Sequence, residues 1–468
     1  MNILSTQGIN KLVSSYGINE RFKRVHPLQL RKNKFTDLSK VWNDLSSKLT
    51  SLKSNLSSLK DNSAGNTFAA KSVELSNKDY FTATATSSAS LSSFDIKVNQ
   101  LAQNDIVMSN TVTASSDSGL SAGTYTIQVA SGEFDQNIDI TVTGTENQKE
   151  MMELIAEAIN DATDSTVTAS VFSPKDGEAK LTVVSKDKGE NNAITIKDVT
   201  GSVLSSIGLD FSSRTITVGN NGGYSHELTD LNSKLTLNGI AIERSSNAID
   251  DLISGVTLSL KSAMDESVPK VNLTIRNNVK EITSDIKEFI KNFNESYKYV
   301  KENYKTTEDG KRGVFVGNSS ALGLTQSMSK IAYAKVEGID IGNYGSLSEI
   351  GITFNSETGL SISDSGDLED ALESNPDQVA DLFTSENGVA NKLYDLVELY
   401  VGSEGAIANL TDSYDKSASF LSDRIETKET QIDKSSDILR RQYESLQIQL
   451  ANLLQSMNDY QSLGGLFN

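Results

Sequence analysis

The chain has 468 residues, a net charge of −19, two histidines and no cysteine. This composition excludes disulfides, thiolate metal sites and cysteine nucleophiles, and two histidines are too few for a histidine-based metal cage. The acidic body also argues against nucleic-acid binding, which needs a basic face, because only residues 1–60 are basic, with eleven Lys or Arg against three acidic residues.

The first 26 residues mix small polar residues with Gly8 and Gly17 and show no stable apolar period. We predict that they are disordered when the protein is alone. Pro27 suits the first turn of a helix, where its missing N–H costs nothing. Apolar residues then recur at steps of three and four, which predicts a stem helix within residues 1–77. This N-terminal seam consists of Phe35, Leu38, Trp42, Leu45, Leu49, Leu52, Leu56 and Leu59.

The apolar period changes to two after Tyr80, which is typical of half-buried strands. Residues 78–110 and 228–278 are therefore predicted to be the two parts of an inner β domain. In the second part Asn238-Gly239 lies between alternating apolar residues, which is the strongest short-range signal of a β-hairpin.

Residues 111–227 lie between these two parts and combine alternating strands with one amphipathic helix. The helix carries Met151, Leu154 and Ile159, and Thr145 and Gln148 before it have the spacing of a capping box. We predict an outer insert domain of the α+β class, and we expect that it can be removed without unfolding the rest.

Helical periodicity returns in residues 279–405. The stripe from Val279 to Tyr304 predicts a long helix, either as ordinary bundle core or as part of the stem. Smaller elements follow: a helix at 320–332, a hairpin at 352–362, and a short helix that begins at Asn375-Pro376.

The C-terminal residues 406–468 predict one stem helix, because no Pro or Gly occurs between Ala406 and Leu463. At ~1.5 Å per residue this helix is roughly 85 Å long, and it needs partner helices because it cannot cover its own apolar stripe. Lys428 and Ser435 interrupt its first half, which is therefore the weaker half. The C-terminal seam consists of Ile425, Ile432, Leu439, Tyr443, Leu446, Leu450, Leu453 and Met457.

Two seams near opposite ends of the sequence predict that the chain leaves a helical stem and later returns to it. The predicted fold is an α+β multidomain protein. Long terminal α-helices form a coiled-coil or helix-bundle stem, and two nested β-rich domains are inserted between them.

Motifs for enzyme chemistry are missing from the sequence. No segment has the pattern of a phosphate-binding loop, a nucleophile elbow or a zinc-protease helix. The acidic run from Asp364 to Asp370 lacks the spacing of a calcium loop and suits the first turn of a helix. We therefore expect no enzyme activity, no cofactor, and no catalytic or metal site.

Three segments resemble proteins of the bacterial flagellum. The most specific is residues 238–258, which resembles the start of the C-terminal region in the filament-capping family, hook-associated protein 2. Residues 121–129 are similar to a repeat of flagellar hook and filament proteins. Residues 350–383 are similar to a later motif of the capping family.

The resemblance implies a non-enzymatic structural cap at the distal end of the flagellar filament. Such caps form a homo-oligomeric ring that promotes the folding and insertion of exported flagellin, and they also meet the hook–filament junction protein. The resemblance further implies an extracellular location at the flagellar tip. It implies export by the flagellar type III system without a cleaved signal peptide, and no nucleic-acid partner or membrane insertion.

A cytoplasmic export chaperone is also implied, since it binds the C-terminal helix of the family. By position, its site here would be made of Ile438, Leu446, Leu450, Leu453 and Leu454.

Three alternatives stay open at this point. Another flagellar axial protein, of the flagellin or hook–filament junction type, would share the terminal helices but should lack the 238–258 segment. A surface adhesin could use the outer insert domain, but it would need an anchor or a signal peptide, and neither is expected here. A cytoplasmic coiled-coil scaffold would leave the nested β domains without a role.

Overall fold

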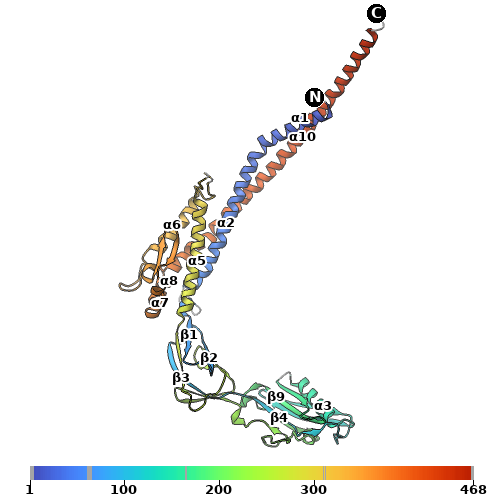
Figure 1. The fold of residues 1–468 in the computed structure, drawn as a ribbon, viewed down its shortest axis with the longest axis vertical. Coiled ribbons are helices and arrows are strands. Elements are labelled where there is room, and N and C mark those ends of the chain that lie inside the picture. Colours follow the sequence, from blue (N-terminus) through green and yellow to red (C-terminus); the bar gives the residue numbers. More distant parts are fainter. Residues whose placement is uncertain (1–4, 61–65, 164–165, 309, 311, 465–468) are drawn as a thin grey trace. The chain divides into compact units, whose positions relative to one another are not determined.

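The computed structural model describes residues 5–60, 66–163, 166–308, 310 and 312–464 (Figure 1). It divides into two units. The helical unit consists of Met1–Phe68 and Val279–Asn468, and the β unit consists of Ala69–Asn278. The chain leaves the helical unit once and returns once, and the predicted fold class, α+β with long terminal helices, is confirmed.

Two consecutive helices at the start of the chain, α1 (Thr6–Arg24) and α2 (His26–Leu59), lie along the last helix, α10 (Ala406–Gly464), in the helical unit. The prediction of disorder for residues 1–26 is wrong where the structure describes them. Ser5 caps α1 by accepting the Gly8 N–H at 3.1 Å. The helix also has an apolar side at steps of four, Ile9, Val13 and Gly17, and all three residues are buried. Residues 1–4 of the predicted segment lie outside the described residues.

Val25 separates α1 from α2. Pro27 lies in the first turn of α2, as predicted. Proline cannot donate a backbone hydrogen bond and disfavours helical geometry in the preceding residue, so it interrupts what would otherwise be one long helix.

The rest of the helical unit is built from shorter elements around α5. The predicted 279–304 helix is present as α5 (Val279–Tyr304), and the predicted 320–332 helix as α6 (Ser319–Tyr333), which Asn318 caps. The predicted hairpin and the Asn375-Pro376 helix are also confirmed. These and the remaining elements are β17 (Ile352–Asn355), β18 (Gly359–Ile362), α7 (Ser365–Ser374), α8 (Pro376–Thr384) and α9 (Val389–Val401).

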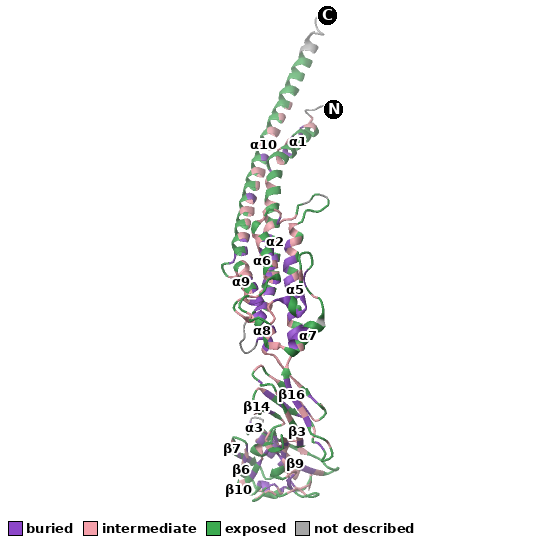
Figure 2. Cartoon of the chain, turned by 90° about the vertical axis from the view of Figure 1, so that its left-hand side faces the viewer, coloured by how far each residue is buried: buried purple, intermediate pink, exposed green. Residues whose placement is uncertain are grey.

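The N-terminal seam is divided between two partners. Its last six residues, Trp42 to Leu59, are fully buried in the core of the helical unit, where α2 packs against α5 and α9 (Figure 2). Phe35 and Leu38 are half-buried, and Phe35 lies beside Tyr414 of α10 with ring centres 6.1 Å apart. The expectation that this whole seam pairs with the C-terminal helix is therefore corrected. The α5 stripe is apolar enough to attract the second half of α2 into a bundle.

The inner β domain consists of two antiparallel sheets around one apolar core. The strand order is β1-β16-β3-β12-β13 in the first sheet and β14-β15-β2 in the second. The strands are β1 (Lys71–Leu75), β2 (Phe81–Ala85), β3 (Ser92–Gln100), β12 (Ser233–Leu237), β13 (Ile240–Arg244), β14 (Ala248–Ile253), β15 (Val256–Leu260) and β16 (Val271–Asn277).

Asn238-Gly239 joins β12 to β13, as predicted. Both residues have a positive φ, 51° and 87°, which is the conformation that a tight hairpin turn needs. The Asn238 side chain also accepts the N–H of Asp95 at 2.9 Å, which attaches the turn to β3. The assignment of residues 71–75 to an N-terminal segment is wrong, because β1 pairs with β16. Only Val73 and Leu75 are apolar in this strand, which is too few for its alternation to be recognised from sequence.

The outer insert domain has its own core and two sheets, in the orders β10-β6-β7 and β11-β4-β9-β5, with β8 paired to β9. Its helices are α3 (Gln148–Ala162) and the single turn α4 (Val203–Ser206). Its strands are β4 (Asn104–Met108), β5 (Val112–Thr113), β6 (Gly123–Ser131), β7 (Phe134–Val142), β8 (Val167–Phe172), β9 (Glu178–Lys188), β10 (Thr195–Thr200) and β11 (Gly223–Tyr224).

The predicted boundary at 110/111 is corrected by β4, which pairs with β9 and β11 rather than with the inner β domain. The chain passes between the domains at Gln103 and Leu231, and the Gln103 N–H donates to the Leu231 carbonyl at 2.9 Å. The outer insert domain is therefore residues 104–230. The boundary was missed because alternation marks a strand without showing which sheet it joins.

The cap of α3 also differs from the expectation. Asn147 and Glu150 form the capping box, rather than Thr145 and Gln148. The Glu146 carboxylate accepts the hydroxyl and N–H of Thr143 and the N–H groups of Gly144 and Thr145. These bonds lower the pKa of Glu146 to about 2, and the bond from the Thr143 hydroxyl has the largest effect. They also hold the loop before the helix in place.

Replacement of residues 104–230 by a short Gly/Ser linker is expected to leave a cooperatively folding protein with nearly all of its helix content. Gln103 and Leu231 are already hydrogen-bonded, so the linker closes a short gap. Circular dichroism during thermal melting is the measurement.

A deletion of residues 111–227 is the matched comparison. It would keep β4 but remove β9 and β11, the strands that pair with it, and it should melt lower and aggregate more readily. Loss of the helical signal in the 104–230 replacement would show that the helical unit depends on the outer insert domain.

Candidate assembly interface

The terminal helices form an antiparallel pair, with α1 and α2 running along α10. Lys32 of α2 donates to Ser422, and further along α10 the Arg21 guanidinium of α1 contacts the carboxylates of Glu429 and Asp433 at 2.6 and 2.5 Å. Arg440 then donates to Asn10 at 2.6 Å. These bonds fix which residues of α10 face each turn of α1.

Side-chain packing accompanies the polar contacts between α1 and α10. A Cβ atom at Gly17 would lie 3.6 Å from the hydroxyl of Ser436, an ordinary van der Waals distance, so α10 lies against α1 at this glycine. Ile432 of α10 is buried in the same region, and Ile425 is half-buried. The first half of the C-terminal seam, which the sequence marks as weaker, is therefore the half that pairs within the chain.

The second half of α10 extends past the start of α1. Leu439 and Tyr443 are half-buried, whereas every described side chain from Ile448 to Asp459 is exposed (Figure 2). Of the predicted seam, Leu446, Leu450, Leu453 and Met457 are exposed on this segment. The residues of the expected chaperone site, Ile438, Leu446, Leu450, Leu453 and Leu454, are also exposed.

Such a stripe is unusual for a folded chain. Large apolar side chains at helical spacing normally lie against another element, and contiguous exposed patches mark interaction sites. Among the described residues, no helix, strand or loop covers this part of α10. We define residues 446–457 as the α10 stripe.

A second group of exposed apolar residues lies near the break between α1 and α2. Ile18 and Phe22 of α1 and Leu30 of α2 are all more than half exposed, and the Phe22 ring stacks on His26 with centres 5.3 Å apart. These residues escaped notice in the sequence because the region was expected to be disordered. Their spacing of four residues, from Ile18 to Phe22, was the available signal.

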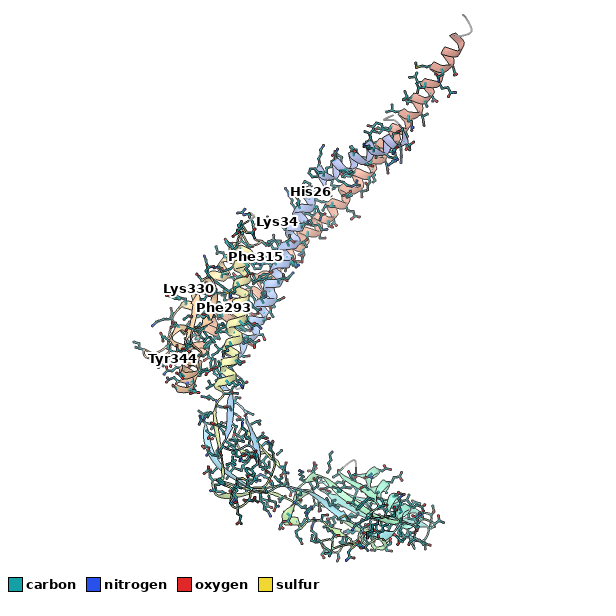
Figure 3. The ribbon with its side chains drawn as sticks, in the orientation of Figure 1. His26, Lys34, Phe293, Phe315, Lys330 and Tyr344 are labelled. Atoms are coloured by element: carbon teal, nitrogen blue, oxygen red, sulfur yellow. The ribbon has the colours of Figure 1, made fainter. Side chains whose placement is uncertain are left out.

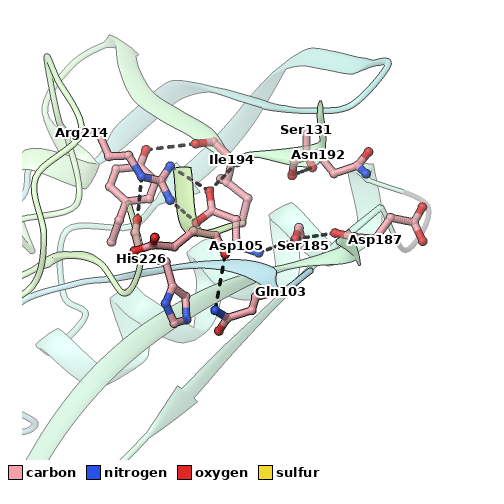
Figure 4. A network of polar contacts seen from close by, with 11 residues as sticks. Gln103, Asp105, Ser131, Ser185, Asp187, Asn192, Ile194, Arg214 and His226 are labelled. Carbon is pink, nitrogen blue, oxygen red and sulfur yellow. Dashed lines mark hydrogen bonds and ion pairs between the residues drawn. The ribbon is translucent and has the colours of Figure 1, made fainter. Parts of the chain in front are cut away.

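A buried polar network in the outer insert domain is another place where ionisable groups gather (Figure 4). Arg214 donates to both carboxylate oxygens of Asp105, at 2.5 and 3.1 Å, and its Nε donates to the carbonyl of His226. Its guanidinium also lies 4.1 Å from the ring centre of Tyr224. Burial, with a smaller effect of Asp105, raises the pKa of Tyr224 to about 12.

This network ties the incoming strand β4 to the outgoing segment around β11, and each of its charges has a partner. Within the described ranges, no three His, Asp or Glu side chains are grouped so as to hold a metal ion. Nor does any helix in the described part of the chain combine the length and apolar character needed to cross a bilayer. The network therefore stabilises the domain, and the α10 stripe is the stronger candidate for function.

Comparison with known proteins agrees with this geometry. Two models of flagellar hook-associated protein 2 match the chain, that of its N-terminus over residues 5–105 and that of its C-terminus over residues 231–458. The chain belongs to the flagellar hook-associated protein 2 family. It is thus a structural component of the bacterial flagellum, of the filament-cap class.

Individual relatives extend the match along most of the chain. It is 25% identical to the B-type flagellar hook-associated protein 2 of Pseudomonas aeruginosa, over 84% of this chain and 81% of the relative. It is also 25% identical to flagellar hook-associated protein 2 of Salmonella typhimurium, over 64% of each. The D1-D2-D3 domains of the flagellar cap protein FliD from Escherichia coli share the fold, with a TM-score of 0.62 and 24% identity over 80% of this chain and 99% of that structure.

Residues 106–230 lie outside both family models. This gap coincides with the outer insert domain, 104–230, whose limits come independently from the pairing of β4 and the Gln103–Leu231 hydrogen bond. The ends of the gap between the two family models therefore agree with the structural boundaries of the domain, and not with the boundaries at 111 and 227 that the sequence predicts.

Proposed function

We propose that several copies of this chain assemble as a ring at the distal tip of the bacterial flagellum, where they promote the folding and insertion of exported flagellin. The observation that carries the proposal is the α10 stripe. A helix of this length that exposes Leu446, Leu450 and Leu453 needs a partner, and neighbouring copies or the filament would supply it.

The proposed ring also meets the hook–filament junction protein, and it reaches the tip through the flagellar type III system without a cleaved signal peptide. Residues 1–60, with their excess of Lys and Arg, complement an otherwise acidic chain. The role requires no enzyme activity and no cofactor.

Before export, the α10 stripe together with Ile438 is the proposed site of the cytoplasmic chaperone. Exposed apolar side chains on a helix promote aggregation, so a protein that covers Ile438, Leu446, Leu450, Leu453 and Leu454 would keep the chain available for export. The chaperone would have to leave before copies assemble, since both would use the same side chains.

Replacing both Leu450 and Leu453 by Ser is expected to abolish assembly while the monomer keeps its melting temperature. Burying each Leu is worth ~1.5–3 kcal/mol, so the double variant should weaken association by roughly a hundredfold or more. Sedimentation velocity of the purified protein and filament length in a complemented deletion strain are the measurements.

The matched control is the Gln449→Ser, Asn452→Ser double variant, which changes exposed polar residues on the same segment. It should assemble and support filament growth like the unaltered protein. If the leucine variant assembles as well as this control, the α10 stripe is not the interface.

A further inference from the structure

An apolar groove of about 630 Å³ lies between α5, α6 and the β17–β18 hairpin of the helical unit. Tyr297 and Val300 of α5 are buried at its base, whereas Leu322 and Tyr333 of α6 line it with exposed side chains. A concave apolar surface beside exposed apolar side chains is suited to receive a side chain from another molecule.

The groove has a basic edge. Lys301 is already used within the unit, because it donates to the Ser356 carbonyl at 2.6 Å and to the Glu357 carboxylate at 3.0 Å. Lys305 and Lys330 are exposed, and neither lies within ion-pair distance of a carboxylate that the structure describes, although Lys305 is near enough to Glu357 to help lower the pKa of that carboxyl. The groove therefore favours a partner that offers an apolar side chain next to negative charge.

A loop of the same chain has that chemistry. Residues 334–345 follow α6, and the loop is closed at its base by the Val336 N–H, which donates to the Gly345 carbonyl at 2.7 Å. Ile341 is fully exposed, and Glu337 and Asp340 of the same loop are exposed too, whereas the basic residue of the loop, Lys335, is paired with Glu349 at 3.6 Å. An isoleucine held in solvent on a closed loop contributes nothing to the core of this unit.

We propose that the 334–345 loop of one copy docks in the groove of a second copy, with Ile341 among the apolar residues and the acidic pair against Lys305 and Lys330. The inference rests on the proposed assembly of several copies. In the isolated chain Ile341 is exposed, so the loop does not fill its own groove. Figure 3 labels Lys330, which lines the groove, and Tyr344, which belongs to the loop. Both lie on the side of the helical unit away from α2.

A loop and a groove are different surfaces of one chain, and each copy carries both. Such contacts can either be exchanged between two copies or continue from copy to copy around a ring. Both arrangements require the same pairing of loop and groove, and this pairing can be tested by exchanging charges.

Two variants of the full chain are needed. In Lys305→Glu, Lys330→Glu the groove becomes acidic, and in Glu337→Lys, Asp340→Lys the loop becomes basic. Each variant alone brings like charges together, and its self-association should fall by roughly tenfold or more. An equimolar mixture should associate again, since each loop then meets a groove of opposite charge. Sedimentation velocity at low ionic strength measures all three samples.

The absence of cysteine from the chain permits a second measurement. Ile341→Cys mixed with Leu322→Cys should form a disulfide-linked dimer under mild oxidation. Ile341→Cys mixed with Thr50→Cys, an exposed position on α2, is the control for random collision. Cross-linking no faster than in this control, or a charge-exchanged mixture that stays as dissociated as its components, would overturn the proposal.

The result is separable from that for the α10 stripe. If the Leu450, Leu453 variant loses assembly while both charge variants associate normally, the proposed function stands and the loop–groove contact is wrong. If the charge exchange restores association, the contact is established whether or not the stripe also contributes.

Discussion

Leu49→Asp is expected to lower the free energy of unfolding of the helical unit by about 4 kcal/mol or more. Leu49 is completely buried between α2 and the elements around α5, so the substitution removes apolar contacts and places an unpaired carboxylate in the core. The loss is a large part of the stability of a typical domain, about 5–15 kcal/mol. The variant should therefore unfold at a clearly lower urea concentration than the unaltered protein.

Tryptophan fluorescence during urea unfolding is the measurement, because Trp42 is the single tryptophan of the chain. Its side chain is buried, and its ring centre lies 4.7 Å from that of Phe315, so its emission reports on this core. Leu30→Asp is the matched control, since it makes the same substitution on the same helix at a side chain that is 57% exposed. The control should lie within about 0.5 kcal/mol of the unaltered protein. Equal midpoints for the two variants would mean that the α2 seam does not stabilise the core.

Leu49 and Leu450 have the same appearance in the sequence, since both belong to seams with steps of three and four. The structure separates their roles. Leu49 is needed for folding of the single chain, whereas Leu450 is exposed on the α10 stripe and is expected to matter only when copies meet. Periodicity shows that a side chain requires a partner, but it does not show whether the partner belongs to the same molecule.

Local patterns predicted much of the fold. The α5 stripe, the uninterrupted C-terminal helix and the Asn238-Gly239 hairpin depend on residues close together in sequence, and all three are present. Helix α1 was missed because Ile9, Val13 and Gly17 form a thin stripe that becomes recognisable only beside α10. A short amphipathic helix of this kind depends on packing against a neighbour rather than on its own propensity.

Long-range pairing could not be predicted. Membership of β4 in the outer insert domain depends on β9, far along the chain, and the partner of Asp105 is Arg214. The α10 stripe could be predicted as a seam, but its exposure depends on where α1 begins. The groove beside Tyr333 and the loop at Ile341 have no sequence signal, because their chemistry arises from which side chains the fold leaves exposed.

Asp105→Asn and Arg214→Met are each expected to lower the stability of the outer insert domain by about 3–5 kcal/mol, because removing one member of a buried ion pair leaves the other charge unpaired. Asp105 is completely buried, and its carboxylate also accepts the Ile194 N–H at 2.8 Å. The Arg214 guanidinium is nearly buried beside Tyr224. Either substitution therefore also disturbs the contact between β4 and the segment that leaves the domain.

The double variant Asp105→Asn, Arg214→Met should recover part of this loss, since it leaves no unpaired charge. The recovered amount measures the coupling between the two side chains. The control is Glu153→Gln, which removes the exposed pair of Lys149 and Glu153 on α3 and should change stability by less than about 1 kcal/mol.

Differential scanning calorimetry of the full chain is the measurement. The transition that disappears when residues 104–230 are replaced by a linker belongs to the outer insert domain, and the Asp105 and Arg214 variants should lower its temperature. The transition reported by Trp42 fluorescence should stay unchanged, because Trp42 lies in the helical unit and both Asp105 and Arg214 lie in the β unit. If the Asp105 and Arg214 variants shift the Trp42 transition equally, the two units do not unfold independently. If they shift neither transition, the buried pair has been replaced without cost and does not hold the two ends of the domain together.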